Sequence, residues 1–221
     1  GMTETSGVVL SQRNDAVRYG TVGGPVPGVE VRVSEVGELQ VRGPVVFQGY
    51  YRNPEATADT IVDGWLHTGD VVQEQEGQLK IVDRLKDIMI TAGGKNLTPS
   101  SIENTMKTSP FIKECIVVAD RRKYAAALIQ IDFETAAQWA EQRQIAFTTF
   151  KSLVETPELR QLIEGEVEAG NQTLAPVAQI RKFHLLTKEL DHDDGEVTAT
   201  MKVRRASIYK AYAAEIEALY G

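Results

Sequence analysis

The chain has 221 residues, of which 42% are hydrophobic and 25% are charged, a composition typical of a globular protein that buries its own core. Its formal net charge of −7 argues against a nucleic-acid partner, because binding to phosphates needs clustered Lys and Arg. The single cysteine excludes an internal disulfide and no apolar stretch approaches the roughly 20 residues of a transmembrane segment, so a cytoplasmic location is expected.

The first part of the chain contains short β-branched runs separated by glycines, a spacing that predicts a small antiparallel sheet or barrel. One helical turn is expected at residues 53–57, where Asn53 can cap the helix and Pro54 suits its first position. The expected strands are residues 29–33, 38–42, 66–72 and 79–82.

The pattern changes to mixed strands and helices after the charged tetrapeptide Asp83-Arg84-Leu85-Lys86. This change predicts a boundary between a β-rich part, residues 1–83, and an α+β part, residues 84–221. Strands are expected at 88–91, 115–119, 125–131 and 180–186, and helices from Thr98 onward and at 133–144, 157–174 and 202–220.

Two short segments of the β-rich part have residues suited to binding a nucleotide. The loop Gly1-Met2-Thr3-Glu4-Thr5-Ser6-Gly7 combines hydroxyls, a carboxylate and glycines, a set that suits phosphate oxygens and Mg²⁺. The segment Trp65-Leu66-His67-Thr68-Gly69-Asp70 ends a predicted strand with a carboxylate that can accept hydrogen bonds from sugar hydroxyls. Taken alone, each of these segments reads as an ordinary turn.

The α+β part contains two candidate cationic sites. Ala92-Gly93-Gly94-Lys95-Asn96 is a glycine-rich loop, expected between a strand and a helix, that fits neither the dinucleotide nor the P-loop pattern. Lys202 is expected to open the last helix after the acidic loop 191–196; the alternative is a solvated cation.

The order of these segments resembles five successive motifs of the adenylate-forming (AMP-binding) superfamily. The motifs are the Thr-Glu-Thr loop, Trp-Leu-His-Thr-Gly-Asp, the Asp-Arg-x-Lys junction, the Gly-Gly-Lys loop and a near-terminal lysine. The junction and the ending Gly-Glu-Val-Thr-Ala-Thr-Met-Lys are most similar to long-chain fatty-acid CoA ligases, although Ala199 stands where that group commonly has proline. The resemblance implies an α+β fold: a small antiparallel β-rich remnant of a large N-terminal domain, followed by an α+β C-terminal lid domain of the acyl-CoA synthetase type.

The resemblance implies a two-step reaction in which a fatty acid attacks the α-phosphate of Mg-ATP and coenzyme A then displaces AMP from the acyl-adenylate. By similarity, Glu4 holds Mg²⁺ and Thr3 contacts the α-phosphate. Asp70 binds the ribose hydroxyls, and Arg84 is a catalytic residue that contacts the ribose or phosphate.

The family resemblance also gives roles to the cationic residues of the second part. Lys202 is the catalytic, nucleotide-binding lysine that bridges the attacking carboxylate and the α-phosphate. Lys86 stands at the hinge about which the C-terminal domain rotates between the two half-reactions. Rotation exchanges Lys202 for Gly93, Gly94 and Lys95, which line the CoA entrance.

The chain is therefore expected to be the C-terminal part of a longer ligase and to be inactive alone, because the phosphate loop and most of the acyl pocket belong upstream. Two alternatives stay open: a fatty-acyl-AMP ligase that loads a carrier protein, and a stand-alone, non-catalytic regulatory module. Peripheral contact with the inner face of the membrane is compatible with the sequence.

Overall fold

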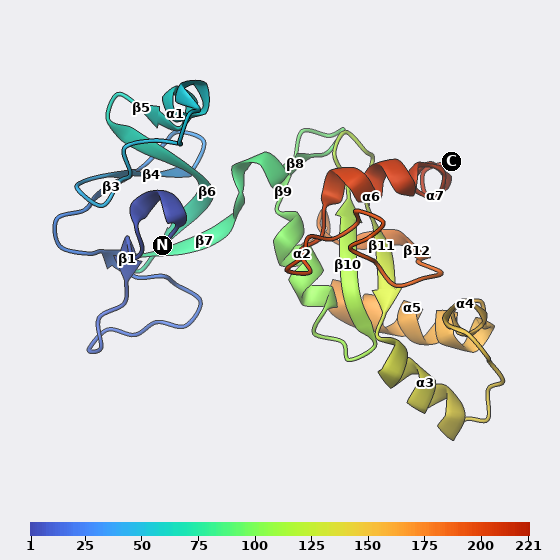
Figure 1. Cartoon of the computed structure of the whole chain (residues 1–221). Helices are drawn as coiled ribbons and strands as arrows, with labels where there is room; N and C mark the ends of the chain where they lie inside the picture. The colour runs from blue at the N-terminus through green and yellow to red at the C-terminus, as the bar shows by residue number, and fades with distance from the viewer. The chain divides into compact units, whose positions relative to one another are not determined.

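The computed structural model describes residues 1–221, which fold into two compact units, Gly1–Ile88 and Met89–Gly221. Each unit has its own sheets (Figure 1). Each also has its own apolar core. The boundary expected after Asp83 stays a prediction, and Asp83 and Arg84 both belong to the last strand of the first unit. None of the helices combines the length and the apolar character needed to cross a bilayer.

The first unit is built on a five-stranded antiparallel sheet in the order β3-β4-β6-β5, with β7 paired to the far half of the long strand β6. A separate ribbon joins β1 to β2. The elements are η1 (Thr3–Thr5), β1 (Leu10–Ser11), β2 (Gly24–Pro25), β3 (Glu30–Val33), β4 (Glu38–Arg42), α1 (Pro54–Thr60), β5 (Ile61–Val62), β6 (Trp65–Gln75), β7 (Gln78–Arg84) and η2 (Leu85–Asp87).

Local signals explain several of these elements. Leu39 and Val41 alternate along β4 with polar residues and enter the apolar core of the unit. The expected helical turn is α1, with Pro54 in its first turn and the Asn53 side chain accepting from the amide of Ala56 (3.1 Å). Two guanidinium groups lie close to the Trp65 ring at the start of β6, those of Arg32 (4.3 Å from the ring centroid) and Arg42 (4.5 Å).

The second unit is built on a three-stranded sheet in which β10 and β11 are antiparallel and β11 and β12 are parallel. A small hairpin, β8 with β9, precedes the sheet. The elements are β8 (Met89–Ile90), β9 (Asn96–Leu97), α2 (Pro99–Met106), β10 (Ile112–Val118), β11 (Ala125–Ile131), α3 (Phe133–Gln142), α4 (Phe150–Val154), α5 (Pro157–Asn171), β12 (Ile180–Leu185), α6 (Arg205–Ala211) and α7 (Ala213–Ala218).

Strand β11 is the centre of this unit, and all of its residues are buried. Its odd-numbered residues pack into a cluster with α2, α3, α4 and α5, whereas Ala126 and Leu128 pack into a second cluster with α6 and α7. Figure 1 shows these two groups of helices on opposite sides of the strands. The apolar run from Ala125 to Ile129 in β11 follows from burial of both faces of the strand.

Several sequence expectations for the second unit differ from the structure. Pro99 begins α2 as expected, but the Thr98 side chain makes no capping hydrogen bond. The expected helix 202–220 is two short helices that meet at Tyr212, and Lys202 lies before the first of them. The short segment at 150–154, which was not predicted, is α4.

The fully buried Leu159 of α5 provides a stability test of this core. Leu159→Ala is expected to lower the free energy of unfolding by about 2–5 kcal/mol, because it removes buried carbons and leaves a cavity. Gln161→Ala, at an exposed position on the same helix, is the matched control and should change it by less than about 0.5 kcal/mol. Urea denaturation of the chain measures both, and equal losses would contradict the packing of α5.

Candidate functional site

The first unit brings two predicted site residues into direct contact. Asp70 on β6 and Arg84 on β7 are register partners in the antiparallel pair. The Arg84 Nη1 atom donates to the Asp70 Oδ1 atom at 2.9 Å, and the Asp70 side chain is 22% exposed. A carboxylate has about four lone-pair sites, so this single bond leaves Asp70 able to accept from sugar hydroxyls.

The backbone before Asp70 is held by the buried carboxylate of Glu38 on β4. Glu38 Oε1 accepts from the amide of Gly69 (2.9 Å), and Oε2 lies 2.9 Å from His67 Nδ1. Gly69 has a positive φ of 69°, and a Cβ there would lie 3.3 Å from the Arg84 guanidinium. Glycine therefore allows both the turn and the close passage of the arginine.

Asp70 also lines a cavity of about 300 Å³ within the first unit. Gly1 and Met2, from the start of the Thr-Glu-Thr loop, form part of its wall, as does the buried Thr68. The cavity therefore places a predicted ribose-binding carboxylate beside the predicted phosphate-binding loop.

The Thr-Glu-Thr loop is a single 3₁₀ turn, η1, closed by its own side chains. The buried Thr5 hydroxyl lies 3.0 Å from the carbonyl oxygens of Met2 and Gly7, and Ser6 adopts a left-handed φ of 55°. Thr3 is exposed on this turn. The turn is thus rigid while leaving the Thr3 hydroxyl accessible.

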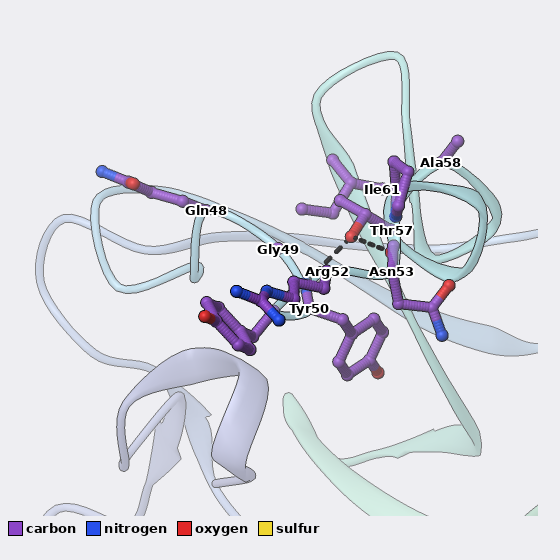
Figure 2. A pocket seen from close by; sticks show the side chains of 10 residues that line it. Gln48, Gly49, Tyr50, Arg52, Asn53, Thr57, Ala58 and Ile61 are labelled. Carbon is purple, nitrogen blue, oxygen red and sulfur yellow. Dashed lines mark hydrogen bonds between the residues drawn. The ribbon is translucent and has the colours of Figure 1, made fainter.

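Glu4 is held by an aromatic residue that the sequence reasoning missed. The Tyr50 hydroxyl donates to Glu4 Oε1 (2.8 Å), and this bond, together with burial, raises the pKa of Tyr50. Figure 2 shows the segment that places Tyr50: the Thr57 hydroxyl accepts from the Tyr50 amide (2.9 Å) and donates to the Asn53 carbonyl (2.9 Å). Tyr50 thus positions the carboxylate predicted to bind Mg²⁺.

The first unit fits Mg²⁺ only as an ion shared with a nucleotide. No group of three or more His, Cys, Asp and Glu side chains forms a metal site in the chain. Mg²⁺ is commonly bound by one or two carboxylates together with substrate phosphates and water, and Glu4 fits that arrangement as a single protein ligand.

The Gly93–Lys95 segment differs from its expected context. It connects β8 and β9 and therefore closes a hairpin rather than opening a helix, which starts only at Pro99. The amide of Gly94 donates to the Thr91 carbonyl (2.8 Å) and that of Lys95 to the Thr91 hydroxyl (3.1 Å). Because the turn itself uses these donors, the exposed Lys95 side chain is what the loop offers to a ligand.

Lys86 and Lys202 are both exposed. Lys86 is the middle residue of η2, close to the end of the first unit. Lys202 lies on a short hairpin of the second unit, where its amide donates to the Thr198 hydroxyl (3.0 Å). Its ammonium forms none of the ion pairs in the structure.

The structure therefore brings Asp70, Arg84 and the start of the Thr-Glu-Thr loop together in one unit and places Lys95 and Lys202 in the other. Sequence reasoning missed the residues that support them. Glu38 is the first residue of a predicted strand and follows Gly37, so its neighbours did not mark it as buried. Nothing in the sequence separates the buried Glu196 from the exposed acids around it.

Comparison with known proteins adds two family matches. Residues 86–221 match the model described as "AMP-binding enzyme C-terminal domain", and residues 1–51 match the model "AMP-binding enzyme". The long-chain-fatty-acid–CoA ligase FadD15 of Mycobacterium tuberculosis is 41% identical over 223 aligned residues, which cover 100% of this chain and 37% of that protein. The chain thus spans little more than a third of that relative's length.

Two solved structures show the same fold. The adenylation domain of a carboxylate reductase from Mycobacterium chelonae superposes with a TM-score of 0.72 at 24% identity, over 91% of this chain and 32% of that one. O-succinylbenzoate CoA synthetase from Bacillus subtilis, solved with ATP and magnesium, has a TM-score of 0.67 at 24% identity, over 93% of this chain and 39% of that one.

The support of the Asp70 loop by Glu38 can be tested through stability. Glu38→Ala removes the acceptor of the Gly69 amide and is expected to lower the free energy of unfolding by about 1–3 kcal/mol. Glu35→Ala, the same substitution at an exposed position, should have little effect. Thermal and urea denaturation measure both variants, and equal stability of the two would show that Glu38 does not hold the loop.

Proposed function

The chain belongs to the AMP-binding enzyme family, and we propose that it is the C-terminal part of a long-chain fatty-acid CoA ligase. Such an enzyme activates a fatty acid with ATP to an acyl-adenylate and then transfers the acyl group to coenzyme A. The observation that carries the proposal is the Asp70–Arg84 pair beside the Thr-Glu-Thr loop, in a chain similar over its whole length to FadD15.

In the proposed reaction the first unit binds the nucleotide. Asp70 accepts hydrogen bonds from the ribose hydroxyls while Arg84 holds its carboxylate in place and adds positive charge near the phosphates. Thr3 donates its hydroxyl to the α-phosphate, and Glu4 contributes a carboxylate oxygen to Mg²⁺. The metal, when bound, neutralises phosphate charge.

Lys202 provides the charge that the first half-reaction requires. Negative charge collects on the α-phosphate as the fatty carboxylate attacks it, and a cation placed there stabilises the transition state. An exposed lysine outside any ion pair is available for this role. The structure also offers a second exposed lysine, Lys95, for the half-reaction with CoA.

The two lysines are proposed to act in turn, by rotation of the second unit about Lys86 between the half-reactions. A cytoplasmic location belongs to the same proposal, and the single, buried cysteine is compatible with it. Assays with CoA and with an acyl carrier protein as alternative acceptors separate the CoA ligase from a carrier-loading enzyme.

Lys202→Ala, in the protein that includes the upstream domain expected from the sequence, should lower acyl-adenylate formation by about 10² to 10³. Thioester formation from supplied acyl-adenylate should be unaffected, because the phosphate is already bonded to the acyl group. Pyrophosphate exchange and thioester yield measure the two steps. Lys210→Ala, an exposed lysine on α6, is the control, and equal loss of both steps in Lys202→Ala would refute the assignment.

Lys86→Pro is expected to impair the second half-reaction, thioester formation, and to spare the first, acyl-adenylate formation. Proline fixes φ and restricts the preceding residue, so the backbone of η2 loses the freedom that rotation requires. Pyrophosphate exchange should persist, while thioester yield should fall about tenfold or more, equivalent to roughly 1.4 kcal/mol in the barrier. Lys86→Ala, which keeps the backbone free, should retain both steps; an undiminished yield in Lys86→Pro counts against the hinge.

A further inference from the structure

Lys202 lies on a hairpin, residues 196–204, whose register is fixed by backbone contacts. The amide of Arg204 donates to the Glu196 carbonyl (2.8 Å), and the amide of Thr198 donates to the Lys202 carbonyl (2.8 Å). Between these bonds, Val197 and Val203 form an antiparallel bridge. These contacts fix the backbone of Lys202 relative to that of Glu196.

Glu196 is the residue that joins this hairpin to the body of the second unit. It is only 3% exposed, and its carboxylate accepts three hydrogen bonds. Oε2 accepts from the Lys188 ammonium (2.7 Å) and the Asp191 amide (3.1 Å), and Oε1 accepts from the Tyr212 hydroxyl (3.1 Å). Because a buried carboxylate is stable only with such partners, these three donors fix its place.

The donors come from separate parts of the unit. Lys188 follows strand β12 and also pairs with Asp194 (2.5 Å), whereas Tyr212 stands where α6 meets α7. Burial opposes the charge of Lys188, but its hydrogen bonds to Asp194 and Glu196 outweigh burial and raise its pKa. Burial and the charge of Glu196 raise the pKa of Tyr212 to about 12. Both groups therefore remain donors at neutral pH.

The C-terminal end of the hairpin is also attached to the rest of the second unit. Arg205, the first residue of α6, forms an ion pair with Glu103 of α2 (2.8 Å) and donates to the Val117 carbonyl (3.1 Å). The tip of the hairpin, residues 199–202, stays exposed. Both ends are thus attached to the core, and only the segment that carries the cation projects from it.

We infer that Glu196, Lys188 and Tyr212 form a positioning cluster that holds the Lys202 hairpin in the orientation needed for acyl-adenylate formation. This role rests on the proposed function of Lys202. None of the three residues has to touch the substrates. They act by fixing the geometry of the hairpin in advance, so that the lysine need not be ordered during the reaction.

Tyr212→Phe tests the cluster with little disturbance, because it removes one donor and keeps the ion pair between Lys188 and Glu196. Tyr220→Phe is the matched control: it removes a hydroxyl that bonds the Val118 (2.7 Å) and Tyr124 (3.3 Å) carbonyls, away from the hairpin. In the protein with its upstream domain, Tyr212→Phe should lower kcat for pyrophosphate exchange by about tenfold with KM for ATP little changed. Thioester formation from supplied acyl-adenylate should be unchanged, and Tyr220→Phe should spare both steps.

Two further measurements make the test independent of folding defects. Lys188→Met should show the same selective loss as Tyr212→Phe. Backbone hydrogen exchange at the Thr198 and Arg204 amides should be faster in Tyr212→Phe than in Tyr220→Phe, because the anchor of the hairpin is weakened.

The outcomes separate this inference from the proposed function. The positioning cluster is overturned if Tyr212→Phe leaves hydrogen exchange at those two amides unchanged or slows both half-reactions equally. It is also overturned if Tyr220→Phe slows pyrophosphate exchange as much as Tyr212→Phe does. Lys202→Ala is measured in the same assay. If Lys202→Ala blocks pyrophosphate exchange but Tyr212→Phe and Lys188→Met do not slow it, only the positioning cluster fails. If Lys202→Ala leaves pyrophosphate exchange intact, the proposed function of Lys202 fails.

Discussion

Burial of strand β11 on both of its faces is the constraint on which the second unit depends. Every side chain of Ala125–Ile131 is removed from water, so helices must cover each side of a sheet that has only three strands. The first side is covered by α2 to α5 and the second by α6 and α7. The hairpin that carries Lys202 leads directly into α6, so its location depends on this second layer.

Buried or partly buried carboxylates support the candidate site residues of both units. Glu38 holds the turn before Asp70, Glu196 holds the base of the Lys202 hairpin, and Glu103 holds Arg205 at its exit. Each accepts several hydrogen bonds, which balances the cost of removing a charge from water. Such groups specify one loop geometry, because any other arrangement leaves a buried charge without its donors.

This arrangement suits the proposed reaction, in which several cations act in succession. Lys86, Lys95 and Lys202 are all exposed on turns, where a long flexible side chain can reach a ligand. The Lys95 turn is held by the carbonyl and hydroxyl of Thr91, and the Lys202 hairpin is anchored by the buried Glu196. Binding energy is then not spent on ordering the turn, and the free side chains remain able to act in different half-reactions.

The sequence by itself determined the family and most regular elements, because adjacent residues carry that information. Three signals are local: the apolar residues of β11, the Asn53–Pro54 helix start and the order of the five motifs. In the structure β11 has its expected bounds, and α1 begins one residue after the expected start and extends to Thr60. The resemblance to AMP-binding enzymes is confirmed by the family matches. The roles of Thr3, Glu4, Asp70, Arg84, Lys86, Lys95 and Lys202 stay predictions.

Only the tertiary structure decided which charged residues are supports and which are exposed. Glu196 lies in a run of acids that looks uniformly solvated, yet Lys188 and Tyr212, from other parts of the chain, bury and bond it. The last helix breaks at Tyr212, whose hydroxyl bonds Glu196. The hairpin between β8 and β9 is bonded to the segment 120–122. Local propensity carries no information about such contacts, because their energy comes from groups brought together only by folding.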